Sequence, residues 1–400
     1  MMASAKMTST WNADTVYAFT VHRSILTLFG SWPLQMKNVS AKIRWYLTVV
    51  AQITSIIPLS YEMYLSCRDV ESIIDAFMCN ATTFSSLMKL TILRFHREKM
   101  VGMIKGAIED WSSIEDPKYR KIMKKHAYMG RLICFSLMTF MYMSYFMYIT
   151  LALALEIINR NETAIGIRTQ REFPLLTTCT FENISVPLYC IIFVIQIVQG
   201  TITCTGIIIN DALFFALTMH LCGQLEILKI EFRMIGKEPN EKGYRSKLRL
   251  LVRRHYHLVQ LAKHLEDSFN VINLMQLLLC AVLICVEGFQ LIVNLKITVD
   301  FSTLKHCLVL NAVLIQLFLY SFSGDYLKTQ SEGVAYAIYD CYWYNLPPDE
   351  VKDLGLVMIR AGIPLILTAG KFFVMTLESF KDILKTSASY MSFLRVMVGE

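Results

Sequence analysis

The sequence predicts an all-α, polytopic membrane protein with seven transmembrane helices and a helical cytosolic anchor domain. Of its 400 residues, 54% are hydrophobic and 18% are charged, whereas soluble domains carry about 25% charged residues. Apolar runs long enough to cross a bilayer recur along the chain. Basic residues gather in alternate loops between these runs, as the positive-inside rule requires of a multi-pass protein.

Six apolar runs of roughly 20 residues predict the first six membrane spans. The second run carries Asp75, Asn80 and Lys89, so we expect it to face other helices rather than lipid. Hydropathy alone leaves the seventh span open between residues 354–377 and the closing segment 381–400. The six runs are 44–64, 73–93, 132–155, 186–209, 271–293 and 304–324.

The basic residues orient these spans. The loops 94–131 and 210–268 each hold about ten Lys and Arg, whereas the loop 156–185 holds three Arg against four Glu. The basic loops are therefore cytosolic, so the N-terminus is cytosolic and, with seven spans, the C-terminus is extracellular. Two N-glycosylation sequons, at Asn161 and Asn183, fall in the loop assigned to the outside.

The cytosolic loops carry helical patterns of their own. Residues 210–232 extend the fourth span without a helix breaker, and residues 247–269 repeat Leu and Val at steps of three and four. These patterns predict an intracellular domain of packed helices. The alternative is a set of juxtamembrane helices that lie on anionic membrane lipid.

Enzymatic and metal chemistry find no support in the sequence. His255, His257 and His264 are spaced so that they do not share one helix face, and no Cys or carboxylate completes a ligand set. We find no nucleophile–base pattern and no glycine-rich phosphate loop, so we expect neither an enzyme nor a cofactor. The net charge of +7 is explained by basic residues in the cytosolic loops and does not indicate nucleic-acid binding. Whether Cys67 and Cys179 form disulfides is left open.

Methionine and aromatic residues are concentrated in the outer halves of spans two to four. Core packing and the aromatic belt explain part of this enrichment. The same residues, with few charges among them, would also line a pocket that holds a small hydrophobic ligand by shape and dispersion. The residues that we predict to contact such a ligand are Phe77, Met143, Phe146, Met147, Thr150 and Phe193.

The last 80 residues resemble the C-terminal signature of the insect odorant receptors. The resemblance rests on Ser323-Gly324-Asp325, on the run from Tyr339 to Tyr344, on Lys371-Phe372-Phe373, and on Leu384-Lys385-Thr386-Ser387 followed by Ser389-Tyr390. Ala388 departs from it, because members often carry Tyr there. The gustatory receptors are a related family, and their Thr-Tyr-hydrophobic-Gln-Phe ending is absent from this chain.

This resemblance implies an odorant-gated, non-selective cation channel in which four subunits each line the pore with their last helix. The family's obligate co-receptor has a long insertion between spans four and five. The corresponding loop is short here, so the chain is expected to be the odorant-specific subunit, paired with the olfactory co-receptor in the plasma membrane of an olfactory sensory neuron.

The resemblance also divides the chain into three segments. Residues 1–43 form a cytosolic N-terminal segment with room for a re-entrant helix, and residues 44–346 carry six spans and the pocket. Residues 347–400 hold an anchor helix at 349–361 and a pore helix at 377–397. In that helix the implied gate is a hydrophobic ring of Met391, Phe393, Leu394 and Met397, and the charges at the cytosolic pore mouth are Lys381, Asp382 and Lys385.

Two alternative functions are considered. The chain could be a seven-helix chemosensory receptor of the gustatory type. It could also be a receptor that signals through a cytosolic transducer, with the basic loop 210–268 as its docking surface.

Overall fold

The computed structural model describes residues 11–65, 70–164, 171–175, 177–181, 184–237, 244–297 and 301–397. The described chain is almost entirely helical, which confirms the predicted fold class. The elements are α2 (Ala13–Leu28), α3 (Val39–Leu65), α4 (Val70–Phe95), α5 (Arg97–Ser113), α6 (Pro117–Ala164), α7 (Val186–Arg233), α8 (Tyr244–Ile297), α9 (Phe301–Tyr339), the 3-10 turn η1 (Trp343–Asn345), α10 (Pro348–Ala361), β1 (Thr368–Ala369), β2 (Phe373–Val374) and α11 (Leu377–Met397).

Four helices are much longer than a bilayer is thick. The helices α6, α7, α8 and α9 have 48, 48, 54 and 39 residues, and at 1.5 Å per residue each exceeds the roughly 30 Å hydrocarbon core. Each of the four contains a window apolar enough to span a membrane. The helices α3, α4 and α11 contain no such window among the described residues, but with 27, 26 and 21 residues they are also long enough to cross.

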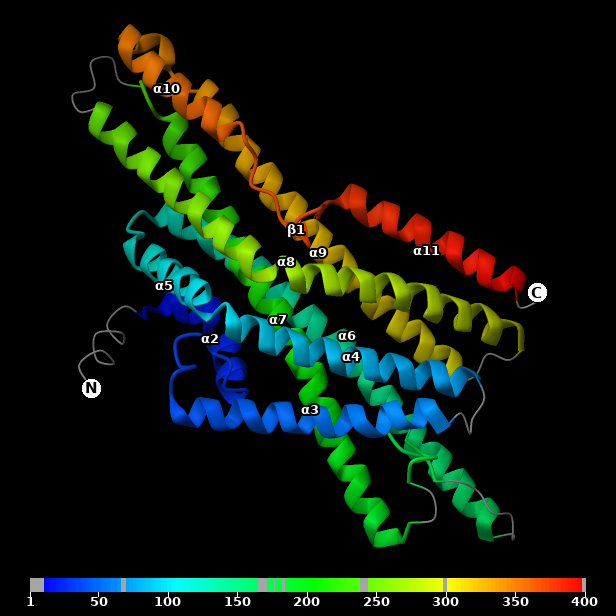
Figure 1. Ribbon diagram of the computed structural model, residues 1–400. Coiled ribbons are helices and arrows are strands. Elements are labelled where there is room, and N and C mark those ends of the chain that lie inside the picture. The colour runs from blue at the N-terminus through cyan, green and yellow to red at the C-terminus, as the bar shows by residue number, and fades with distance from the viewer. Residues whose placement is uncertain are drawn as a thin grey trace.

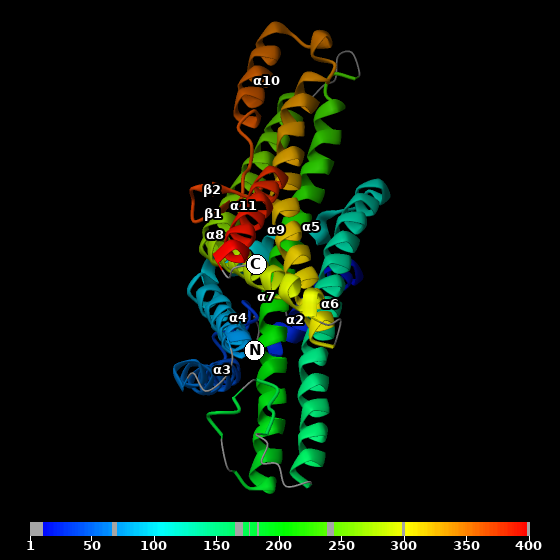
Figure 2. The same cartoon turned by 90° about the vertical axis from the view of Figure 1, so that its right-hand side faces the viewer.

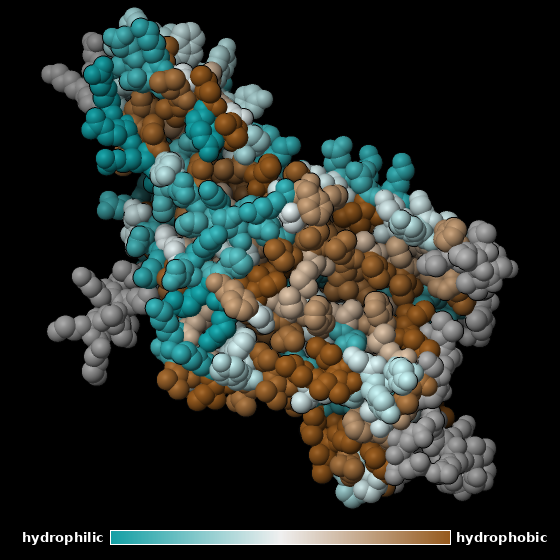
Figure 3. Space-filling model, in the orientation of Figure 1, coloured by the Kyte–Doolittle hydropathy of each residue, from teal (hydrophilic) through white to brown (hydrophobic). Residues whose placement is uncertain are grey.

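The surface divides into a hydrophilic end and an apolar band. Figure 3 shows hydrophilic side chains at the upper left, where the ends of α7, α8 and α9 meet α10 in Figure 1, and apolar side chains over the middle and lower right. The long helices therefore continue out of the membrane into a helical anchor, on the side that the basic loops assign to the cytosol.

Helix α7 is the centre of the bundle. It is apolar on all sides and buried almost continuously from Thr203 to Leu228, as expected for a helix enclosed by others. Aromatic rings of Phe214, Phe269 and Tyr320 pack there at centroid distances of 5.1 and 5.2 Å from Phe214. Figure 2 shows α6 and α7 running side by side along the length of the molecule, with α3 and α4 beside them.

The C-terminal elements decide between the two candidates for the last span. Residues 348–361 form α10 in the anchor, and the chain then turns back through the β1–β2 hairpin. Gly370 and Lys371 both have positive φ at that turn, a backbone that hairpin turns favour. Thr368 N donates to Glu266 at 2.8 Å and Asn273 donates to the Thr368 carbonyl, which fixes the hairpin to α8. Helix α11 is thus the membrane-length element, with the bounds predicted for 377–397.

Candidate functional site

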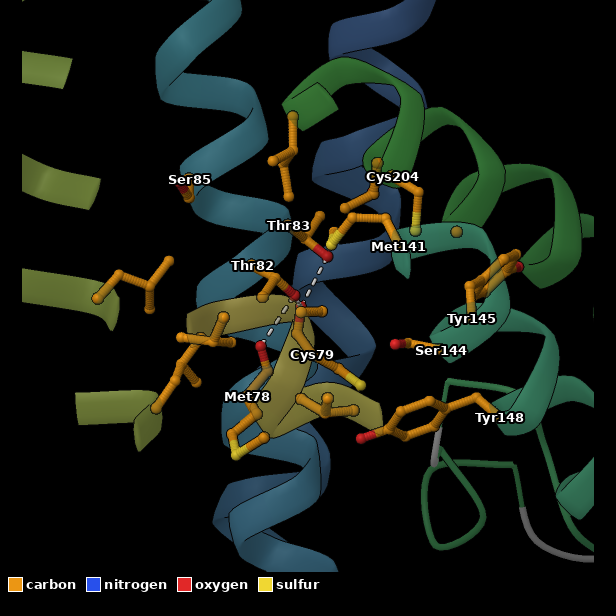
Figure 4. A pocket seen from close by; sticks show the side chains of 18 of the residues that line it. Met78, Cys79, Thr82, Thr83, Ser85, Met141, Ser144, Tyr145, Tyr148 and Cys204 are labelled. Carbon is orange, nitrogen blue, oxygen red and sulfur yellow. Dashed lines mark hydrogen bonds between the residues drawn. The ribbon is translucent and has the colours of Figure 1, made fainter. Parts of the chain in front are cut away.

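A cavity of about 130 Å³ lies between α4, α6, α7, α8 and α9. Pro174 and Leu175, from the extracellular link between α6 and α7, contribute to its outer end. Figure 4 shows side chains from α4 and α6 pointing into it from opposite sides. The lining residues are Met78, Cys79, Thr82, Thr83, Ser85, Met141, Ser144, Tyr145, Tyr148, Pro174, Leu175, Gly200, Thr203, Cys204, Ile207, Gln276, Leu279, Leu283, Val309, Ala312, Val313 and Gln316.

Most hydroxyl groups in this wall are already hydrogen bonded within the protein. Thr82 and Thr83 donate to the carbonyls of Met78 and Cys79 at 2.9 and 2.8 Å (Figure 4). Tyr145 donates to the Ile197 carbonyl at 2.9 Å. Such bonds lower the polarity that the wall presents to a ligand, because each donor has been used.

A few polar atoms in the wall remain available. Within the described ranges the hydroxyls of Ser85, Tyr148 and Thr203 donate no hydrogen bond, and the side-chain carbonyl of Gln276 is buried without a partner. The cavity can therefore offer hydrogen bonds to one polar group of a ligand that is otherwise apolar.

A buried ion pair lies next to the inner end of the cavity. Lys89 Nζ on α4 is 2.6 Å from Asp211 Oδ1 on α7, and both side chains are almost fully buried. Tyr320 and Gln316 also donate to Asp211, at 2.5 and 2.6 Å, so three donors compensate one carboxylate. Since Gln316 lines the cavity, this network links the cavity wall to the helix core.

A second buried pair lies at the outer side. Lys305 Nζ on α9 is 2.5 Å from Asp75 Oδ2 on α4, and it stands 5.4 Å above the ring of Tyr148, a cavity residue. Close by, His306 and Glu287 lie 2.7 Å apart and are fully buried. The burial of Asp75 and Lys89 confirms that the second span faces other helices, where its charges are paired.

The six residues predicted to contact ligand do not line the cavity. Phe77, Met143 and Phe146 are exposed on the outer surface of α4 and α6, where lipid would meet them. Their neighbours Met78, Ser144 and Tyr148 face inward. Successive residues of a helix point about 100° apart. The predicted residues therefore lie on helices that line the cavity, but their side chains point away from it.

The other three predicted contacts have partners elsewhere. Phe193 is buried in an aromatic cluster, 5.6 Å from the ring of Tyr189. Met147 is buried outside the lining, and Thr150 donates to the Phe146 carbonyl at 3.0 Å. Small residues that do line the cavity, such as Cys79 and Thr82, were not predicted, because the prediction selected Met and aromatic residues.

Glu62 on α3 anchors the extracellular link over the cavity. Its carboxylate accepts hydrogen bonds from Cys179 N at 2.9 Å and from the amide and hydroxyl of Thr180, both at 2.8 Å. Gln196 on α7 accepts from Leu175 N at 3.3 Å. Cys179 is disulfide bonded, whereas Cys67 lies outside the described residues.

Helix α8 joins the cavity to α11. Leu279 and Leu283 line the cavity, while other positions of the same stretch meet α11. The Ser387 hydroxyl donates to the Ala281 carbonyl at 3.5 Å. A Cβ added to Gly288 would lie 2.6 Å from the terminal methyl of Met391, so α8 and the predicted gate region are in direct contact.

The remaining predicted positions are placed as follows. Lys381, Asp382, Lys385 and Phe393 are exposed on α11, and Met391 packs against Gly288. The side chains of Leu394 and Met397 and of the sequon residue Asn161 lie outside the described parts, as does Asn183. Among the described residues, no group of three His, Cys, Asp or Glu side chains could hold a metal ion.

Membrane-length helices, a cytosolic helical anchor and an apolar cavity between the helices define a multi-pass helical membrane protein with an internal cavity of small-molecule size. The family model "7tm Odorant receptor" matches residues 69–388, and the chain belongs to this family. Its members are odorant receptors, ligand-gated cation channels and not enzymes, so the family match favours the odorant receptor over the gustatory alternative.

Curated relatives and solved structures agree with this assignment. Odorant receptor 13a of Drosophila melanogaster is 26% identical, over 92% of this chain and 93% of its own. Odorant receptor 10a of the same organism is 22% identical, over 95% and 96%. The olfactory receptor OR5 of Machilis hrabei, solved in complex with eugenol, shares the fold with a TM-score of 0.80 at 16% identity, covering 95% of this chain and 97% of that one.

Proposed function

We propose that this chain is the odorant-specific subunit of a non-selective cation channel, which opens when a small hydrophobic volatile binds in the cavity between α4, α6, α7, α8 and α9. The observation that carries the proposal is the wall itself, which is largely apolar and keeps few free hydrogen-bonding groups. A cavity of about 130 Å³ is close to the roughly 150 Å³ that admits benzene in an engineered protein. A molecule of about one ring with one polar group suits it, and the eugenol complex of OR5 supports this class of ligand.

Binding is proposed to reach the pore through α8. A ligand that contacts Leu279 and Leu283 acts on the helix that also carries Ala281 and Gly288 against α11. If it binds the open arrangement more tightly than the closed one, it shifts the population toward open channels. An opening ratio that rises 100-fold requires a binding preference of about 2.7 kcal/mol.

The pore is assigned to α11 on the basis of its exposed side chains. Lys381, Asp382 and Lys385 are exposed at its cytosolic end and Phe393 at its outer half, so these surfaces remain for neighbouring subunits and the pore. Met391, Phe393, Leu394 and Met397 are proposed to form a hydrophobic constriction that dewets when closed.

The partner is proposed to be the olfactory co-receptor in a heteromeric, tetrameric channel. The complex would reside in the plasma membrane of the dendrite or cilium of an olfactory sensory neuron, with Asn161 and Asn183 glycosylated outside. The short 210–268 loop supports assignment to the odorant-specific subunit.

The cavity is tested by filling it. Val313→Phe places a ring inside the lining, whereas Val194→Phe makes the same change on the exposed outer surface of α7. Both variants are expressed with the co-receptor and tested for odorant-evoked current and surface density. We expect Val313→Phe to lose the response at normal surface density and Val194→Phe to keep it. An unchanged response of Val313→Phe would contradict the proposal that the odorant binds in this cavity.

The heteromeric assembly is tested separately. Cells that express this chain alone and cells that express it with the co-receptor are exposed to one panel of volatiles under voltage clamp. We expect current only with both subunits. Odorant-evoked current from the chain alone would contradict the partnership and leave the cavity assignment standing.

A further inference from the structure

Cations without acidic partners in the described chain gather at the cytosolic end of α3, at the end of α4 and at the start of α5. Lys42, Arg94 and Arg97 form no ion pair with a carboxylate anywhere in the described chain. Other cations on this side do, since Lys99 pairs with Asp267 at 2.9 Å and Arg120 with Asp14 at 3.1 Å. We call Lys42, Arg94 and Arg97 the α3–α4 basic cluster.

The tertiary structure places Arg94 against α3 and close to Arg97. The Arg94 guanidinium lies 4.6 Å above the ring of Trp45 on α3, and Arg97 is close enough to repel it electrostatically. Tyr46 also interacts with Arg94. Lys42 precedes Trp45 by three residues and Tyr46 by four, which places it on the same side of α3 one turn nearer the cytosol.

The cluster contains hydrogen-bond donors that the protein does not use. The indole N–H of Trp45 and the Nε of Arg97 are shielded from solvent and have no acceptor among the described residues. Arg94 makes only long bonds of 3.4 Å to the carbonyls of Gly30 and Met36. Buried donors are almost always satisfied, and cationic donors bind anionic oxygens most strongly.

The neighbouring carboxylate does not fill this role. Glu98 follows Arg97 directly, but it is exposed and forms no ion pair within the part of the chain described. The repulsion between Arg94 and Arg97 is therefore not compensated by a carboxylate in the described chain, and an external anion would relieve it.

The surface beside the cluster indicates where that anion comes from. Ile43, Leu47 and Val50 expose between 54 and 65% of their surface along one face of α3, an apolar surface suited to contact with lipid acyl chains. Figure 3 shows this apolar surface along the lower edge, where α3 lies in Figure 1, meeting hydrophilic side chains at its left end. The cytosolic leaflet is the one that carries anionic lipids.

We infer that the α3–α4 basic cluster binds the phosphate-bearing headgroup of an anionic phospholipid in the cytosolic leaflet. The acyl chains lie along the exposed face of α3, and the aromatic rings of Trp45 and Tyr46 stand at the level of the interface, where such side chains are favoured. The inference is independent of the odorant and of the co-receptor.

The test measures lipid binding to the full-length purified chain in detergent. The probe is fluorescent phosphatidylinositol 4-phosphate, compared with fluorescent phosphatidylcholine. Lys42→Gln/Arg97→Gln removes two charges that make no hydrogen bond in the described structure and leaves Arg94 in place against Gly30. Lys105→Gln/Lys118→Gln is the matched control, because both lysines are exposed cytosolic-side residues outside the cluster.

We expect the wild-type chain to prefer the anionic probe and the cluster variant to bind it roughly 30-fold more weakly, since each basic residue contributes about fivefold. The control variant should bind like the wild type. Equal affinity for the two lipids, or an equal loss in the control variant, would overturn the inference. Soluble inositol 1,4-bisphosphate should compete weakly, and competition equal to that of the lipid would reassign the site to free phosphates.

Discussion

The buried pair of Lys89 and Asp211 allows a quantitative test of how this bundle is held together. Their side chains expose 2% and 1% of their surface and their charged atoms lie 2.6 Å apart. Lys89→Met would leave the Asp211 carboxylate buried with only Tyr320 and Gln316 as donors. Removing one partner of a buried pair costs about 3–5 kcal/mol, because the remaining charge is uncompensated.

The matched control is the same substitution in an exposed pair. Lys99 and Asp267 lie 2.9 Å apart, but Lys99 exposes 40% of its side chain. We therefore expect Lys99→Met to cost less than about 1 kcal/mol. Both variants are measured by denaturant-induced unfolding of the purified chain in detergent, followed by tryptophan fluorescence.

The double variant Lys89→Met/Asp211→Asn separates charge from packing. It removes both charges, while the amide oxygen introduced at position 211 can still accept from Tyr320. The double variant should therefore recover more than half of the stability lost in Lys89→Met. Equal losses in Lys89→Met and Lys99→Met, or additive losses in the double variant, would refute the argument that an uncompensated charge is responsible.

Other contacts lead to three further predictions. Gly288→Ala forces the flexible end of Met391 to move, so we expect normal surface density with altered basal current. Gly355→Ala, which meets open space, should change nothing in the same recording. Glu62→Gln weakens three charge-assisted hydrogen bonds by about 1.5–3 kcal/mol. We therefore expect faster amide hydrogen exchange at residues 177–181. An unchanged exchange rate would show that Glu62 does not hold this segment in place. Burial lowers the pKa of His255 below 6.5, so the unfolded chain binds more protons below that pH. Stability should therefore fall as pH drops through 6.5, less in His255→Gln, and parallel pH profiles would contradict this.

The positions of the membrane spans were accessible from the sequence because apolar length is a local property, although α6 and α9 extend well beyond the predicted runs and α5 falls in a segment predicted as a loop. The anchor helix predicted at 349–361 and the last helix predicted at 377–397 correspond to α10 and α11. The polar residues of the second span correctly indicated burial, since unpaired charge is costly in lipid. The relation of 1–43 to the membrane and the roles of the three segments stay predictions, although α2 lies within 1–43.

The cavity wall was not accessible in the same way. Phe77 and Phe146 belong to helices that line the cavity, but Met78 and Tyr148 are the residues that face it. The membrane part of α6 is apolar on every side and has no amphipathic stripe, so hydropathy does not reveal its rotation. On α4 the buried charges Asp75 and Lys89 mark the inward side, and the choice of Phe77 did not use them. Hydropathy also does not identify Ser85 and Thr203 as cavity residues, because small hydroxyl residues occur just as often at the contacts between packed helices.

The membrane class, the orientation, the positions of the membrane spans and the odorant receptor signature follow from the sequence alone, because apolar length, loop charge and local motifs act within a few turns of the chain. Tertiary packing sets which face of each helix points inward. It also paired Lys89 with Asp211 and Lys305 with Asp75, positions 122 and 230 residues apart. It left Lys42, Arg94 and Arg97 together without a carboxylate partner in the described chain. Such outcomes depend on how separate helices rotate and pack against one another, which no single stretch of sequence encodes.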